Sequence, residues 1–84
     1  MANWWMPVAQ LRLMRRMAAG EKLVRDVRTR RYFFANGDSV TSSARSLAGK
    51  GLISEGRASK YEIQMSITPT GKNELGYNRH REID

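Results

Sequence analysis

The segment from Asp38 to Ile53 places the strongest constraint on how this chain can fold: it reads Asp-Ser-Val-Thr-Ser-Ser-Ala-Arg-Ser-Leu-Ala-Gly-Lys-Gly-Leu-Ile. Residues 41–49 are predicted to form a helix, because apolar side chains recur on one side at helical spacing: Val40, Ala44, Leu47 and Ala48. Thr41, in preference to Asp38, is expected to accept a hydrogen bond from a free N–H group at the start. Two glycines, which readily take the left-handed conformation that ends helices, indicate the exit: Gly49 and Gly51.

The opposite side of this predicted helix is small and polar and carries a single charge. Its members are Ser42, Arg45, Ser46 and Gly49. Such a face can enter a DNA groove without steric conflict, and it still offers hydroxyl and guanidinium donors. The helix is therefore a candidate for nucleic-acid recognition.

Size and charge limit the classes of protein that remain. The chain has 84 residues, enough for one domain with a small core, and it carries 15 Lys and Arg against 8 Asp and Glu, a net charge of +7. A chain this basic favours a polyanionic partner, most often nucleic acid, although the charge could simply keep it soluble. The absence of cysteine excludes disulfides and thiolate metal sites. No apolar run approaches the roughly 20 residues that span a bilayer, and the start does not resemble a signal peptide, so we expect a cytoplasmic protein without a membrane partner.

Residues 8–19 are predicted to form an amphipathic helix that ends at Gly20, after an irregular lead in which Asn3 or Pro7 opens the helix. The apolar arc consists of Leu11, Leu13, Met14, Met17 and Ala18, and the opposite arc consists of Arg12, Arg15 and Arg16. This arginine stripe could meet phosphates or an acidic protein, or it could be a solvated helix face. Of Trp4 and Trp5, one is expected to cover the core, and the other could lie in a partner interface or also pack on the domain's own surface.

The segment from residue 21 to residue 34 allows either a helix or a hairpin. We favour strands at 23–27 and 31–35 joined by a turn at 28–30, because the segment is rich in β-branched and aromatic residues. The following Asn36-Gly37 is a strong turn signal.

The last third of the chain predicts a hairpin followed by a short helix. Residues 54–60 are expected to form a polar tip, and the alternation from Tyr61 to Ile67 is typical of a half-buried strand. Thr68 and Pro69 are expected to cap and open a helix that reaches Leu75. Residues 76–84 carry many charges and little apolar content, so they are expected to form a frayed, flexible tail.

Two strings in this part of the chain resemble winged helix-turn-helix proteins. Leu47-Ala48-Gly49-Lys50-Gly51-Leu52-Ile53 looks like the end of their recognition helix, and Ile67-Thr68-Pro69-Thr70-Gly71 is similar to their Leu-Thr-x-x-Gly exit from the wing. The resemblance covers residues 38–75, and residues 8–37 only loosely, because the family usually has another helix where residues 21–34 stand. It implies an α+β fold: a small winged-helix domain of residues 1–75, with helices packed on a short antiparallel sheet and a C-terminal wing hairpin. Small basic chains of this type also occur among phage and mobile-element proteins.

No catalytic constellation is visible, so we expect no enzyme activity, cofactor or metal. His80 is the only histidine, the carboxylates form no paired motif, and Gly49-Lys50-Gly51 ends a helix whereas a phosphate-binding loop starts one.

The first of two functional hypotheses is a DNA-binding transcriptional regulator. The resemblance implies that residues 41–49 lie in the major groove of double-stranded DNA with the hairpin of residues 52–67 on the backbone, often as a homodimer. The residues expected to contact DNA are Thr41, Ser42, Arg45, Ser46, Lys50, Arg57 and Lys60. Among these, Arg45 is expected to reach a base edge.

The second hypothesis is a phage-encoded protein-binding inhibitor on the same scaffold, for example an anti-CRISPR protein. It would present the stripe of Arg12, Arg15 and Arg16 to an acidic or nucleic-acid-binding protein. The distribution of charge keeps this alternative open, because eight of the 15 basic residues lie between Arg12 and Arg31, whereas the helix face carries only Arg45.

Overall fold

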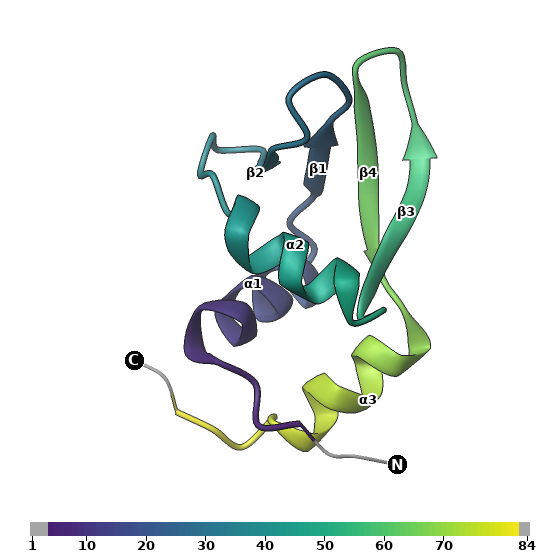
Figure 1. Cartoon of the computed structure of the whole chain (residues 1–84). Coiled ribbons are helices and arrows are strands. Elements are labelled where there is room, and N and C mark those ends of the chain that lie inside the picture. Colours follow the sequence, from purple (N-terminus) through teal and green to yellow (C-terminus); the bar gives the residue numbers. More distant parts are fainter. Residues whose placement is uncertain (1–3, 83–84) are drawn as a thin grey trace.

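A computed structural model describes residues 4–82, which form three helices and a four-stranded antiparallel sheet (Figure 1). In chain order the elements are α1 (Val8–Ala18), β1 (Leu23–Asp26), β2 (Tyr32–Phe34), α2 (Thr41–Gly49), β3 (Ile53–Ala58), β4 (Glu62–Ile67) and α3 (Pro69–Tyr77). The strand order in the sheet is β2-β1-β4-β3. The predicted α+β class, with helices on a short antiparallel sheet, is therefore confirmed.

The sheet consists of two hairpins placed side by side. In the first, Leu23 pairs with Phe34 and Arg25 with Tyr32, so the segment that allowed two interpretations is a hairpin, as favoured. The hairpins join through β1 and β4, where Asp26 pairs with Glu62. As a result the β1–β2 turn and the β3–β4 turn lie at the same end of the sheet, at the top of Figure 1, and α3 lies at the other end.

The core lies between α1, α2 and the sheet. Its fully buried side chains come from every layer and include Leu11, Met14, Leu23, Phe34, Leu47 and Ile53. The apolar face predicted for α2 is confirmed, since Ala44 and Leu47 are buried and Val40 and Ala48 pack against the core. In α1 the predicted arc holds except at its end, where Ala18 is exposed.

The exit of α2 matches the glycine signal. Gly51 has φ 75°, the left-handed conformation expected after the helix. Its N–H donates to the carbonyl of Ala48, and the N–H of Leu52 donates to the carbonyl of Leu47. These two bonds form a Schellman motif, which satisfies the last carbonyls and turns the chain directly into β3.

The entry of α2 differs from the prediction. The residue at the N-cap is Val40, and no side chain caps the first turn. The Thr41 hydroxyl instead accepts a hydrogen bond from the backbone N–H of Tyr32 at 3.0 Å, and the N–H of Val40 donates to the carbonyl of Tyr32. Because β2 is an edge strand running beside the start of α2, its free N–H group competes successfully for the hydroxyl.

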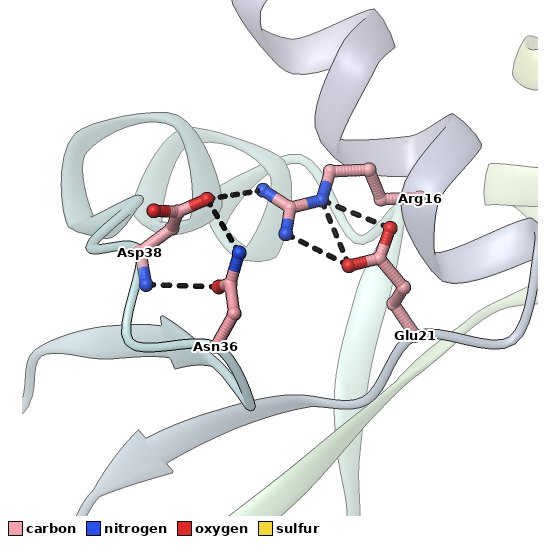
Figure 2. A network of polar contacts seen from close by, with 4 residues as sticks. All are labelled: Arg16, Glu21, Asn36 and Asp38. Atoms are coloured by element: carbon pink, nitrogen blue, oxygen red, sulfur yellow. Dashed lines mark hydrogen bonds and ion pairs between the residues drawn. The ribbon is translucent and has the colours of Figure 1, made fainter.

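A polar network holds the β2–α2 loop against the end of α1 (Figure 2). The guanidinium of Arg16 bonds to the carboxylates of Glu21 at 2.7 Å and Asp38 at 3.1 Å, and it lies 3.9 Å from the centroid of the Phe34 ring. Asn36 donates to the Asp38 carboxylate and accepts from the Asp38 N–H. Hydrogen bonds from Asn36 and then from Arg16 lower the pKa of Asp38, and Arg16 lowers the pKa of Glu21. The network therefore ties the loop that leads into α2 to the end of α1.

The predicted start of α3 is confirmed, and its fit against the sheet depends on one glycine. The Thr68 hydroxyl accepts from the N–H of Gly71 and donates to the carbonyl of Gly51, so one side chain caps α3 and ties it to the exit of α2. A Cβ atom at Gly71 would overlap the carbonyl oxygen of Leu52. Glycine is therefore required for this close approach.

The segment expected to fray from residue 76 packs on the domain as far as the structure describes it, and α3 itself runs to Tyr77. The Asn78 side chain is fully buried, accepts from the N–H of Met6 and donates to the carbonyl of Trp4. Arg15 donates to the carbonyls of residues 78, 79 and 81. Composition does not reveal these contacts, because most of them are made to backbone groups. Residues 83–84 of the predicted tail, like Asn3, lie outside the described residues.

The tip of the second hairpin is shorter than predicted. Residues 54–58 of the expected polar tip belong to β3, and only residues 59–61 form the turn. Tyr61 lies in this turn with 59% of its surface exposed, not on the inner face of a strand. The side chains of β3 after Ile53 are all exposed, so backbone pairing to β4, not burial, forms this part of the strand.

Candidate nucleic-acid interface

The outer face of α2 presents its side chains to solvent in the predicted arrangement. Ser42, Arg45 and Gly49 are exposed and Ser46 is half-buried. Within the described residues the Arg45 guanidinium has no hydrogen-bond or ion-pair partner. Thr41 differs from these residues, because its hydroxyl already accepts from the Tyr32 N–H and lies 3.4 Å from the Ser39 hydroxyl. The structure thus brings together a short polar surface centred on one unengaged arginine.

Lys50 follows α2 immediately and is positioned by an aromatic ring. Its ammonium lies 4.6 Å from the centroid of Trp4, within the range of a cation–π interaction. Trp4 is half-buried against the core, and its backbone N–H donates to the Glu74 carboxylate at 2.8 Å. One of the two tryptophans therefore covers the core, as expected, and it also places a cation beside the end of α2.

The β3–β4 hairpin carries Arg57 and Lys60 on surfaces that face solvent. Both are exposed, and the Lys60 ammonium lies 5.4 Å from the centroid of the Tyr61 ring. An ion pair at 2.6 Å between Arg25 of β1 and Glu55 of β3 spans β4 and braces the hairpin against the rest of the sheet. The hairpin that carries the two predicted wing residues is thus tied to β1 by an ion pair.

Three further cations, which were not predicted as site residues, lie at the same end of the sheet. Arg28, Arg30 and Arg31 are all exposed in the β1–β2 turn. The N–H of Val27 donates to the carbonyl of Tyr61 at 3.0 Å, which joins this turn to the β3–β4 turn. The density of arginine here was visible in the sequence. Its proximity to the second hairpin was not, because it depends on the pairing of β1 with β4.

The β1–β2 turn is held in one shape by its own hydrogen bonds. The Asp26 carboxylate accepts from the N–H groups of Thr29 at 2.9 Å and Arg28 at 2.8 Å, and these bonds, that of Thr29 first, lower the pKa of Asp26. The carbonyl of Asp26 accepts from the N–H of Arg30, and Arg30 has φ 62°. The turn therefore carries its arginines on a preformed backbone.

The arginine stripe of α1 is largely engaged inside the fold. Arg15 holds the segment after α3, and Arg16 holds the loop before α2. Arg12 is exposed and lines, together with Arg16 and Ser42, a groove of about 570 Å³ between α1 and the start of α2. At least two of the three arginines of the stripe are therefore used in contacts within the fold.

The part of the chain covered by the structure contains no cluster of three or more His, Asp or Glu side chains that could hold a metal ion, and His80 is exposed. None of the helices within residues 4–82 has the length and apolar character needed to cross a membrane. Comparisons with known protein families, with curated proteins and with solved structures find no match to this chain.

Proposed function

We propose that this chain is a DNA-binding protein of the winged helix-turn-helix type, acting as a transcriptional regulator. In this proposal α2 is the recognition helix in the major groove, and the β3–β4 hairpin is the wing on the backbone. The observation that carries the proposal is the unengaged Arg45 at the centre of an exposed, small-residue helix face, followed directly by a hairpin with exposed cations. A β1–β2 hairpin stands where the family usually has a helix.

The proposed contacts divide into readout of bases and placement on the backbone. Arg45 would donate two hydrogen bonds to a guanine, while Ser42 and Ser46 are short enough to let the helix approach the base edges. Lys50, Arg57 and Lys60 would contact phosphates, which set the register without reading sequence. Thr41 would support the helix from within the fold through its bond to the Tyr32 N–H, so we assign it a positioning role in place of the expected DNA contact.

The magnitude of readout available from one helix argues for a dimer. One bidentate arginine discriminates between bases by about 1–3 kcal/mol. Specific DNA-binding proteins exceed their non-specific binding by about 4–10 kcal/mol. A single α2 therefore falls short, and two copies on two half-sites would come much closer.

The proposal is tested by titrating the protein with random duplex DNA at two salt concentrations, followed by selection from a random-sequence duplex library. We expect binding that weakens steeply with salt and a selected sequence that contains guanine. Arg79→Ala removes one exposed arginine from the segment after α3 and is the control for Arg45→Ala. If the wild-type protein binds no duplex even at low salt, the proposal is wrong.

A second candidate is a protein-binding inhibitor, and one observation favours it. Trp5 is 64% exposed, and it lines a groove with Val8 and Tyr77, which are 42% and 48% exposed. The Arg81 guanidinium stacks on the Trp5 ring at 4.0 Å. Exposed tryptophan, tyrosine and arginine are typical of protein interfaces. This candidate would use Trp5 and Tyr77 in place of the full arginine stripe, and capture of a protein by the wild type but not by Trp5→Ala would support it.

A further inference from the structure

We propose that the β1–β2 turn is a second arm for binding the DNA backbone, acting beside the β3–β4 wing. The inference rests on the proposed function and deepens it. Its cations are Arg28, Arg30 and Arg31, and it would extend the backbone contact already proposed for Arg57 and Lys60.

The two turns form one continuous surface. Asp26 and Glu62 pair across β1 and β4, and the next residue, Val27, donates its N–H to the carbonyl of Tyr61 at 3.0 Å. Neighbouring strands in a sheet are about 4.8 Å apart, so the two tips are separated by little more than one strand spacing. A DNA strand that contacts one tip is therefore within reach of long side chains on the other.

The charge at this end is strongly one-sided. Residues 26–31 and 57–62 carry five cations against two carboxylates, and this difference is three of the chain's seven net positive charges. One of the two carboxylates, Asp26, is directed to the backbone of its own turn by the bonds to Thr29 and Arg28. A surface with this excess fits the phosphates of a nucleic-acid strand.

The tips also expose apolar groups between the cations. Tyr61 is 59% exposed and Val27 is 46% exposed, and neither is needed to complete the core. Nucleic-acid-binding proteins place apolar and aromatic side chains among basic ones, where they stack on bases or insert between base steps. This mixture fits duplex DNA better than it fits a purely acidic protein surface.

Arg30 adds an argument from backbone conformation. Its φ of 62° makes it the only non-glycine residue with positive φ in the described part of the chain. Glycine adopts this conformation without strain, and asparagine tolerates it better than arginine does. An arginine here brings a cation to the tip at the expense of an easier turn, and strain of this kind is concentrated at functional sites.

The test compares two double variants that remove the same charge from opposite ends of the fold. Arg28→Ala with Arg31→Ala removes two cations from the proposed arm. Lys72→Ala with Arg79→Ala removes two exposed cations from α3 and the residues after it. Binding to random duplex DNA is measured over a series of salt concentrations, and circular dichroism checks that each variant folds. The slope of log K against log salt is negative for DNA binding. We expect the arm variant to reduce its magnitude by about 2, roughly one per lost phosphate contact, and the control to leave it unchanged.

Two further measurements make the outcome specific. Arg28→Lys with Arg31→Lys keeps both charges and should restore the slope, because phosphate contacts need charge more than guanidinium geometry. Polyglutamate serves as a competitor. If it displaces random duplex at the same charge concentration, the tips attract any polyanion and the proposal is wrong.

The results also separate this inference from the proposed function. An unchanged slope for the arm variant, with Arg45→Ala still losing the preferred sequence, overturns the second arm and leaves the recognition helix in place. The reverse pattern is a reduced salt dependence for the arm variant with no effect of Arg45→Ala on binding to any sequence. It supports the second arm and overturns the proposal that α2 is the recognition helix of a regulator. A wild type that binds no duplex overturns both.

Discussion

Replacing Arg30 with glycine should make the protein more stable and weaken its binding to DNA. Because stability and DNA affinity should change in opposite directions, a loss of binding cannot be explained by a loss of folding. A non-glycine residue in the left-handed region costs roughly 1–2 kcal/mol. Glycine in turn lowers the free energy of unfolding by about 0.5–1 kcal/mol relative to alanine, because its unfolded chain has more conformational freedom. Within the described residues the exposed Arg30 side chain makes no hydrogen bond or ion pair that would offset the difference, so the net gain in the free energy of unfolding is about 0.5–1 kcal/mol. For a domain of this size that corresponds to a rise in melting temperature of roughly 2–8 °C.

Arg28→Gly in the same turn is the matched control. Arg28 does not have positive φ, so glycine relieves no backbone strain at this position. The substitution should lower the free energy of unfolding by about 0.5–1 kcal/mol. Thermal melts followed by circular dichroism give both values. In salt titrations with random duplex, the magnitude of the slope of log K against log salt should fall by about one for each variant. If Arg30→Gly melts no higher than Arg28→Gly, the argument from strain fails.

Three other changes test separate parts of the structure. Arg45→Ala should lose about 1–3 kcal/mol of binding to the selected sequence, much less to random duplex, and leave the melting temperature unchanged, as fluorescence anisotropy and thermal melts would show. Gly71→Ala should destabilise the fold by about 3 kcal/mol or more, because its Cβ would meet backbone, whereas Gly76→Ala meets open space and should be neutral or stabilising in urea titrations. The pKa of Glu21 is lowered by Arg16, so this stabilisation is present above the ordinary carboxyl pKa and lost as pH falls through the lowered one. Arg16→Gln should therefore flatten the fall of stability between about pH 5 and 3, and equal acid limbs for the two proteins would contradict this reasoning.

Local signals in the sequence predicted most of the elements. Helical spacing of apolar residues located α2 to the residue, and the Thr68-Pro69 pair located the start of α3. The β-branched and aromatic content of residues 21–34 correctly favoured strands over a helix. Each of these signals acts over a few neighbouring residues, so no knowledge of distant contacts was needed.

Features that depend on distant partners could not be predicted in the same way. Thr41 is expected to cap its own helix until β2 is known to lie beside it and offer the N–H of Tyr32. The contacts of Asn78 with backbone groups near the other end of the chain were missed, because charge and apolar content carry no sign of them. The arginines of the β1–β2 turn joined the candidate site only when the strand order was known. The DNA-binding role remains a proposal that the binding experiments test.

The buried Asn78 has a consequence for the order in which the fold assembles. Its contacts with Met6 and Trp4 span 72 and 74 positions of the chain, so they close a loop that contains almost the whole domain. The entropy of closing such a loop is lost before these bonds form, and the sheet and α1–α2 contacts close shorter loops first. We therefore expect this contact to form late in folding and to open early in local unfolding. The amide of Met6, which donates to Asn78, should then exchange its hydrogen with solvent faster than the amides of β1 and β4.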